Sequence, residues 1–283
     1  MFPDGKPIRH IATTFDGNLF ATAEFKEQVS IWKVDSGEKI ISFPTHLDYG
    51  GRRLAISTDG HLCAAGAYSI YGVSVYRTTD GSLVWSRRDL KKIQWLKFDP
   101  TQKTLLAGFS ERPLHLLDSK TGETIKTFRG VRKKFISPYN SNIFLLDSSK
   151  LLLCNTSNSP ISIIRYTFAI LDVAFSPHAV FLTESGGPLR AVNCSDGSLL
   201  WAYIPEEGSH FLRIGYNESS DTLFGIKWAY HKGGPYVLHE FNSKTGDLLS
   251  KKVLESNICE TGFANRGNQL ITSNGIFLTE PTG

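Results

Sequence analysis

The chain has 283 residues, a formal net charge of +4 at pH 7 and an aromatic content of 12%. Apolar runs such as Ile143–Leu146 have the length of a strand, far short of the roughly 20 residues that span a bilayer, so we expect no membrane-spanning segment. The nearly balanced charge gives little long-range attraction for nucleic acids, which makes nucleic-acid binding the weaker expectation.

A tight turn that ends in glycine recurs along the chain. Its clear copies end in Gly37, Gly81, Gly122, Gly197, Gly246 and Gly283. Each glycine supplies the positive φ that a tight hairpin needs, and most copies follow a β-rich stretch such as Val29–Val34. Successive glycines are 44, 41, 75, 49 and 37 residues apart, and the 75 is two periods with a degenerate repeat at Asn155–Asn158 between them. Another 37 residues lead from Gly283 round to Gly37 through the joined ends. Seven repeats of about 40 residues therefore account for the chain, which is the length range of propeller blades.

A second turn lies about 14 to 20 residues beyond each glycine turn. It follows an apolar residue, as in Phe15–Gly17, Ile56–Gly60, Phe98–Pro100, Ile136–Pro138 and Phe175–Pro177. Each repeat thus predicts four short strands, which in the first repeat are one that ends at Phe15, then Leu19–Ala23, Val29–Val34 and Lys39–Phe43.

The predicted fold class is all-β, since no stretch has a helical period. We expect one domain, residues 1–283, that forms a seven-bladed β-propeller of four-stranded blades, because isolated blades cannot bury both of their faces. The repeat count is whole only when the ends are joined. The N-terminal segment, Met1 to Ile8, is therefore predicted to close the last blade, which ends at Thr279.

The cysteines and histidines predict neither disulfides nor a metal site. Cys63, Cys154, Cys194 and Cys259 lie in four different repeats, with no close pair, and the eight histidines are scattered. We expect buried, reduced thiols. Met1–Gly5 has neither the basic nor the apolar region of a secretory signal, so we expect a cytoplasmic protein.

The repeats resemble those of two propeller families. Val29–Trp32 followed by Asp35–Gly37, and Leu114–Asp118 followed by Lys120–Gly122, are similar to WD repeats, although Lys33 stands where that family has its name-giving Asp. Asp80–Trp85 and Asp196–Trp201 are more similar to repeats of pyrroloquinoline-quinone dehydrogenases. That resemblance implies a Trp docked between blades, and so it concerns packing rather than the quinone.

Motifs for catalysis are missing from the sequence. There is no Gly-x-Ser-x-Gly elbow, phosphate loop or His-Glu-x-x-His, and most carboxylates sit at turns, where they bond to the local backbone. Asp172 and Glu260 start predicted inner strands and are the two candidates for the calcium-binding carboxylates of a lactonase-like propeller. We expect no catalytic residue, no metal and no cofactor.

Basic residues gather in the loops that join each outer strand to the next inner strand. In a propeller these loops emerge on the same face as those joining the second strand to the third. The first four of them carry Arg52, Arg53, Arg87, Arg88, Lys91, Lys92, Arg129, Arg132, Lys133, Lys134 and Arg165. Asp48 and Asp89 oppose them locally, and the next such loop carries Glu206 and Glu207. The pattern predicts a positive arc on one rim, although ordinary solvated loops would produce the same composition.

An insertion rich in aromatic residues lies in one of the loops that join a second strand to a third strand, on that same face. The spacing of 49 marks an insertion at Lys227–Tyr236, which contains Trp228, Tyr230 and His231. Insertions in repeat proteins often lie on the binding face, and Trp and Tyr are favoured at binding hot spots. The alternative is that Trp228 and Tyr236 extend a long hairpin and pack on it.

These features predict a non-catalytic protein-interaction module. Its partner-binding residues would be Arg52, Arg53, Arg87, Arg88, Lys91, Lys92, Arg132, Lys133, Lys134, Trp228, Tyr230 and His231. The expected partner is a protein with an acidic surface, and the role is that of an adaptor or an immunity-type inhibitor. The alternatives are nucleic-acid binding by the same rim and a small-molecule enzyme, lactonase- or quinone-dependent, in the central channel. The oligomeric state stays open.

Overall fold

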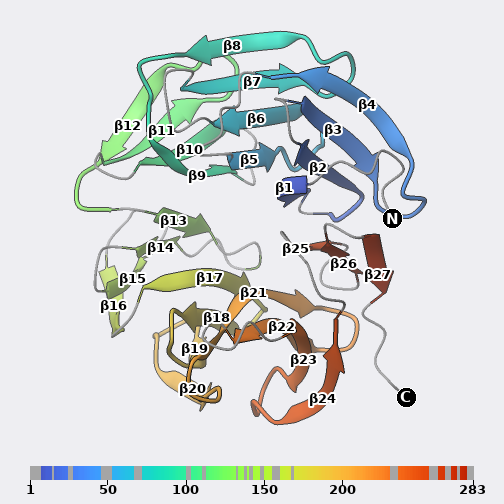
Figure 1. Ribbon diagram of the computed structural model, residues 1–283. Helices are drawn as coiled ribbons and strands as arrows, with labels where there is room; N and C mark the ends of the chain where they lie inside the picture. Colours follow the sequence, from blue (N-terminus) through green and yellow to red (C-terminus); the bar gives the residue numbers. More distant parts are fainter. Residues whose placement is uncertain are drawn as a thin grey trace. The chain divides into compact units, whose positions relative to one another are not determined.

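The computed structural model describes most of the chain. The described residues are 8–14, 16–24, 28–45, 53–66, 72–99, 103–109, 113–131, 133–136, 139, 143–146, 150–154, 160–166, 169–229, 235–254, 261–264, 269–272 and 275–278. They contain strands and turns and no helix, so the all-β prediction is confirmed for this part of the chain. It follows that no helix in it could cross a bilayer. The described strands form antiparallel sheets, six of four strands and one of three (Figure 1).

The chain forms two compact units. The first comprises Met1–Lys134, Cys259–Asn265 and Gln269–Phe277, and the second comprises Phe135–Ile258, Arg266–Asn268 and Leu278–Gly283.

The first unit contains four sheets, each with its strands in chain order. The first sheet is β1 (Ile8–Thr13), β2 (Leu19–Glu24), β3 (Gln28–Lys33) and β4 (Lys39–Pro44). The second is β5 (Arg53–Ile56), β6 (Leu62–Gly66), β7 (Val73–Arg77) and β8 (Leu83–Arg87). The third is β9 (Ile93–Phe98), β10 (Thr104–Phe109), β11 (Leu114–Asp118) and β12 (Thr124–Phe128). The three-stranded sheet is β25 (Thr261–Ala264), β26 (Gln269–Thr272) and β27 (Gly275–Leu278).

Three further sheets belong essentially to the second unit. One is β13 (Lys133–Ile136), β14 (Ile143–Leu146), β15 (Lys150–Cys154) and β16 (Pro160–Arg165). The next is β17 (Ile170–Phe175), β18 (Ala179–Glu184), β19 (Leu189–Asn193) and β20 (Leu199–Tyr203). The last is β21 (Ser209–Asn217), β22 (Thr222–Ala229), β23 (Val237–Asn242) and β24 (Leu248–Val253).

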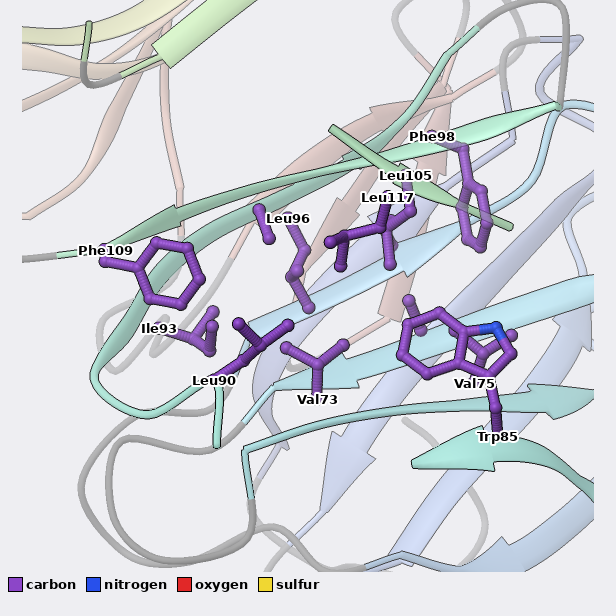
Figure 2. Close-up of a cluster of buried hydrophobic side chains, with 13 residues drawn as sticks. Val73, Val75, Trp85, Leu90, Ile93, Leu96, Phe98, Leu105, Phe109 and Leu117 are labelled. Carbon is purple, nitrogen blue, oxygen red and sulfur yellow. The ribbon is translucent and has the colours of Figure 1, made fainter. Parts of the chain in front are cut away.

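Within each unit, neighbouring sheets pack like propeller blades. The first strand of one sheet contacts the first strand of the next, as β1 contacts β5, β5 contacts β9, β1 contacts β25 and β17 contacts β21. Apolar side chains fill the space between the sheets, because second strands such as β10 and β18 bury both of their faces. Figure 2 shows the cluster between the second and third sheets, with Val73, Val75 and Trp85 from one and Leu96, Leu105 and Leu117 from the other. Each large side chain of this kind contributes about 1.5–3 kcal/mol when fully buried.

The outer strand of one sheet packs against the repeated turn glycine of the next sheet. Gly122 and Gly246 have φ of 76° and 77°, and a Cβ on them would lie 2.7 Å from the ring of Trp85 and 2.6 Å from that of Trp201. The two indoles donate to the carbonyls of Ser119 and Ser243, both at 2.9 Å. These tryptophans therefore dock between sheets, as the quinoprotein-like repeats implied. Glycine is required twice over, once for its φ and once for the space.

The ends of the chain test the predicted closure only in part. Residues 1–7 and 279–283 lie outside the described residues. Ile8 belongs to the first sheet, where it pairs with Glu24 of β2, and so it does not extend a closing strand. Thr13 donates its hydroxyl to the carbonyl of Phe263 at 3.0 Å, which joins the first sheet to β25. Closure by residues 1–7 stays a prediction, as does the single domain.

Candidate interaction surface

The loop from β8 to β9 is the best-defined part of the predicted basic rim. Arg87, the last residue of β8, donates Nε to Asp89 Oδ1 at 2.7 Å and Nη2 to Oδ2 at 2.6 Å. Its Nη1 donates to the carbonyl of Gly122, in the β11–β12 turn of the next sheet, at 2.8 Å. Arg87 therefore ties the loop to itself and to the neighbouring sheet.

The backbone of this loop is anchored at three further points. Leu90 is 2% exposed and lies in the cluster between the second and third sheets (Figure 2). The amides of Leu90 and Lys91 donate to the carbonyls of Arg87, at 3.4 Å, and Asp89, at 3.2 Å. Gly72, with φ of 68°, lies so close beneath the carbonyl of Arg87 that a Cβ there would overlap it. The loop is consequently built as part of the fold.

Four cations come together around this loop. Arg88, Lys91 and Lys92 are exposed, and Arg53, half-buried at the start of β5, donates Nε to the carbonyl of Gln94 on β9. Arg53 is about forty residues away in sequence, so the packing of β5 against β9 brings it to the base of the loop. We call Arg53, Arg88, Lys91 and Lys92 the basic cluster. Asp89, the carboxylate within the loop, is already paired with Arg87.

The predicted contact of Arg87 with the partner stays a prediction. All three of its guanidinium nitrogens also donate to acceptors within the fold, so Arg87 has a structural role as well. The sequence could not show this, because one of the acceptors is a backbone carbonyl in another repeat.

The other predicted basic residues are placed only in part. Arg52 and Arg132 lie outside the described residues, and Lys133 and Lys134 begin β13 with side chains that are not described. Arg129 is exposed after β12, and Arg165 is exposed at the end of β16 in the second unit. The basic cluster is thus the part of the predicted arc that the structure brings together.

Trp228 and Tyr236, at the two ends of the aromatic insertion, pack against each other and form what we call its stem. Trp228, near the end of β22, stacks on Tyr236 with ring centroids 6.2 Å apart and an interplanar angle of 14°. The ring of His210 meets Trp228 edge-on at 6.1 Å. This is the packing that the alternative interpretation expected, although both rings remain partly exposed. Tyr230 and His231 lie outside the described residues, and their binding role stays a prediction.

Of the two carboxylates considered for catalysis, the one that the structure describes bonds to a neighbouring sheet. Asp172 accepts the amide of Ile214 from the next sheet at 3.0 Å, and Glu260 lies outside the described residues. Glu206, predicted to oppose the positive arc, pairs at 2.8 Å with Lys227, whose side chain is 9% exposed. Among the described residues, no three His, Cys, Asp or Glu side chains are grouped to hold a metal.

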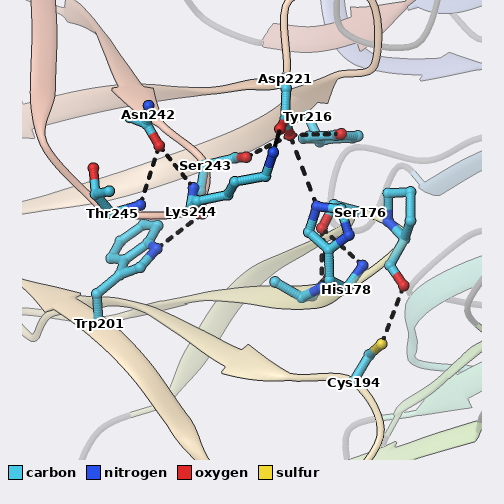
Figure 3. A network of polar contacts seen from close by, with 12 residues as sticks. Ser176, His178, Cys194, Trp201, Tyr216, Asp221, Asn242, Ser243, Lys244 and Thr245 are labelled. Carbon is cyan, nitrogen blue, oxygen red and sulfur yellow. Dashed lines mark hydrogen bonds and ion pairs between the residues drawn. The ribbon is translucent and has the colours of Figure 1, made fainter.

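A polar network that the sequence did not indicate surrounds Asp221 (Figure 3). Asp221 accepts the hydroxyls of Tyr216 at 2.9 Å and Ser243 at 2.6 Å, pairs with Lys244 at 2.7 Å, and lies 4.0 Å from His178. These bonds lower the pKa of the carboxyl although its partial burial opposes them. Since Asp221 and His178 come from turns of adjacent sheets, the network joins the two sheets. Its members already bond to one another, so we assign it a structural role.

The three described cysteines are also structural. Cys63, Cys154 and Cys194 are buried, and burial raises the pKa of Cys63 to about 12. A thiol with so high a pKa is a poor nucleophile.

Comparison with known proteins adds no relationship: no protein-family model matches the chain, and no curated protein sequence matches it.

Proposed function

We propose that the protein is a non-catalytic interaction module that binds an acidic protein partner through the basic cluster. In this proposal the chain forms a seven-bladed β-propeller of four-stranded blades, with the N-terminal segment closing the last blade. The observation that carries the proposal is that Arg88, Lys91 and Lys92 are exposed on a loop whose carboxylate is paired with Arg87, and that Arg53 bonds to Gln94 on the strand that follows this loop.

Such a cluster acts through a local field. The formal net charge of the whole chain is only +4, so the four cations form a local concentration of charge rather than reflect a strongly basic chain. Positive patches of this kind accelerate encounter with acidic surfaces and suppress wrong partners. An adaptor or an immunity-type inhibitor in the cytoplasm would use the cluster in the same way.

The proposal is tested by reversing charge in the cluster. The double variant Arg88→Glu/Lys91→Glu and the matched control Lys103→Glu/Lys120→Glu change the same total charge, but the control lies in turns at the other end of the strands of the third sheet. Each tagged protein is used to capture partners from an extract of the native host, and the recovered species are identified by mass spectrometry. We expect the wild type and the control to recover the same acidic protein and the cluster variant to lose it.

The kinetics with the recovered protein give the second readout. Charge reversal should slow association at least tenfold at low salt, and the wild-type association rate should fall as salt rises, because steering acts through a screened field. Equal recovery by both variants would show that the cluster is not the binding face. Recovery of nucleic acid instead of protein would favour the alternative function.

A further inference from the structure

We infer that the loop of residues 88–92 is a preformed binding element for clustered carboxylates on the partner, in which Asp89 is a positioning residue and Lys92 a contact residue. The inference rests on the proposed function and deepens it, since it names the groups that the cluster recognises. Three observations support it.

The first is the clamp on the loop. Asp89 carries a negative charge in the middle of a positive surface, which would weaken attraction for an acidic partner if charge alone mattered. Its two oxygens instead hold Arg87 in a bidentate pair, and Arg87 reaches on to Gly122. Asp89 therefore fixes the course of the loop between Arg88 and Lys91, and less conformational freedom is lost when a partner binds.

The second is the buried anchor. Leu90 points into the core between two sheets (Figure 2). Arg88 and Lys91, in the same loop, are exposed. A fully buried side chain in the middle of a basic loop holds the surrounding cations outward.

The third is the backbone of Lys92. Its φ is 62°, a left-handed conformation that crowds the Cβ of any residue except glycine. Among the described residues with positive φ, all but Lys92 and Asp221 are glycines, and Asp221 is the centre of a polar network. Residues in such strained conformations cluster at functional sites, and this supports a functional role for Lys92.

The shape of the cluster selects the partner chemistry. Four cations in one compact patch match a short acidic segment with several Asp or Glu side chains. Proteins that bind a nucleic-acid strand instead use a positively charged groove that follows the phosphate backbone.

The inference is tested with a fluorescein-labelled peptide of eight glutamates at low ionic strength. Asp89→Asn removes a negative charge, so a field acting alone predicts tighter binding than wild type. A positioning role predicts weaker binding, by about three- to tenfold. Asp80→Asn, in the turn at the opposite end of β8, is the control for net charge and should bind at least as well as wild type. Asp89→Glu keeps the carboxylate and should recover much of the loss.

Lys92→Gly provides the second arm. It relaxes the backbone, so the melting temperature should be unchanged or higher, while peptide affinity should fall by about three- to tenfold for the loss of one contacting charge. Melting curves for every variant separate a binding defect from unfolding.

The possible failures are distinct. If the octaglutamate does not bind wild type, or if Arg88→Glu/Lys91→Glu binds it as well as wild type, the proposed function is overturned. If that double variant loses binding but Asp89→Asn binds more tightly than wild type, the positioning role is overturned while the function stands. Unchanged affinity in Lys92→Gly overturns the contact role of Lys92. Tighter binding of an oligothymidylate of equal charge overturns the assignment to carboxylates.

Discussion

Single residues decide how tightly the sheets of this protein hold together. His239 on β23 is 0% exposed and lies among Tyr203, Phe211 and Phe241, with ring centroids 5.4 to 6.5 Å away. Its Nε2 has no hydrogen-bond partner among the described residues. The ring is thus a polar group accommodated in its neutral form, which makes it sensitive to acid.

The first prediction concerns acid stability. Burial lowers the pKa of His239 to about 4, and the nearby charges of Lys227 and Lys251 act in the same direction. The unfolded chain therefore takes up a proton near pH 6.5 that the native state refuses until about pH 4, so stability is lost as pH falls through this window. We expect His239 to account for a loss of up to about 3 kcal/mol in the unfolding free energy.

Urea unfolding between pH 7.5 and pH 4.5 would measure this loss, with His239→Phe as the comparison. The variant should have a shallower dependence on pH. It should keep some slope, because burial also lowers the pKa of His210. Identical slopes in the two proteins would show that His239 does not control acid stability.

Whole elements are joined by contacts that repeat from sheet to sheet. Outer strand β20 places Trp201 on the turn at Gly246 in the same way that β8 places Trp85 on the turn at Gly122. One element of each repeat therefore completes the packing of the next, and the repeats depend on one another.

The second prediction is that Trp201 and Gly246 are energetically coupled. Trp201→Leu should cost about 2–4 kcal/mol, since it loses ring packing and the bond to Ser243. Gly246→Ala should cost about 2 kcal/mol, because its Cβ meets the indole and its φ is left-handed. The double variant should be less unstable than the sum by about 1 kcal/mol or more, because the smaller side chain removes the clash. Additive costs in a denaturation cycle would contradict direct contact.

The third prediction concerns the β22–β23 hairpin. Trp228→Ala removes the stacked pair with Tyr236, so we expect it to lower stability by about 1 kcal/mol. Tyr230→Ala, within the insertion, should leave the melting temperature unchanged. If Trp228→Ala melts like wild type but releases the captured partner faster, the ring is a binding anchor rather than part of the stem.

At the scale of the whole molecule, closure of the ring is the property that the repeat count demands. The sheet of β25, β26 and β27 has three described strands, one fewer than each of the others. A closing strand from residues 1–7 would supply the fourth and protect the outer edge of that sheet.

The fourth prediction is that removal of residues 1–7 destabilises the protein. We expect the melting temperature to fall by several degrees and amide exchange in β27 to accelerate, because its outer edge would become exposed. Exchange in β9 and β10, far along the chain, should accelerate less. Unchanged exchange in β27 would rule out closure by this segment.

The sequence by itself determined the all-β class and the four-stranded repeats, and the resemblance of two repeats to quinoprotein repeats implied the docked tryptophans. Turn glycines and alternating apolar residues are local signals, and they recur often enough here to be recognised without any matching family. The sequence also indicated that basic residues concentrate after the outer strands.

Only the tertiary structure decided which of those residues can act together. Arg53 lies beside the loop of Arg88 and Lys91 because β5 packs against β9, and Arg87 takes on a structural role because it bonds to Asp89 and to Gly122 in another repeat. The buried setting of His239 and the network around Asp221 were likewise invisible in the sequence. Each depends on partners tens of residues away, and distance in space between such groups is fixed by packing rather than by local sequence pattern.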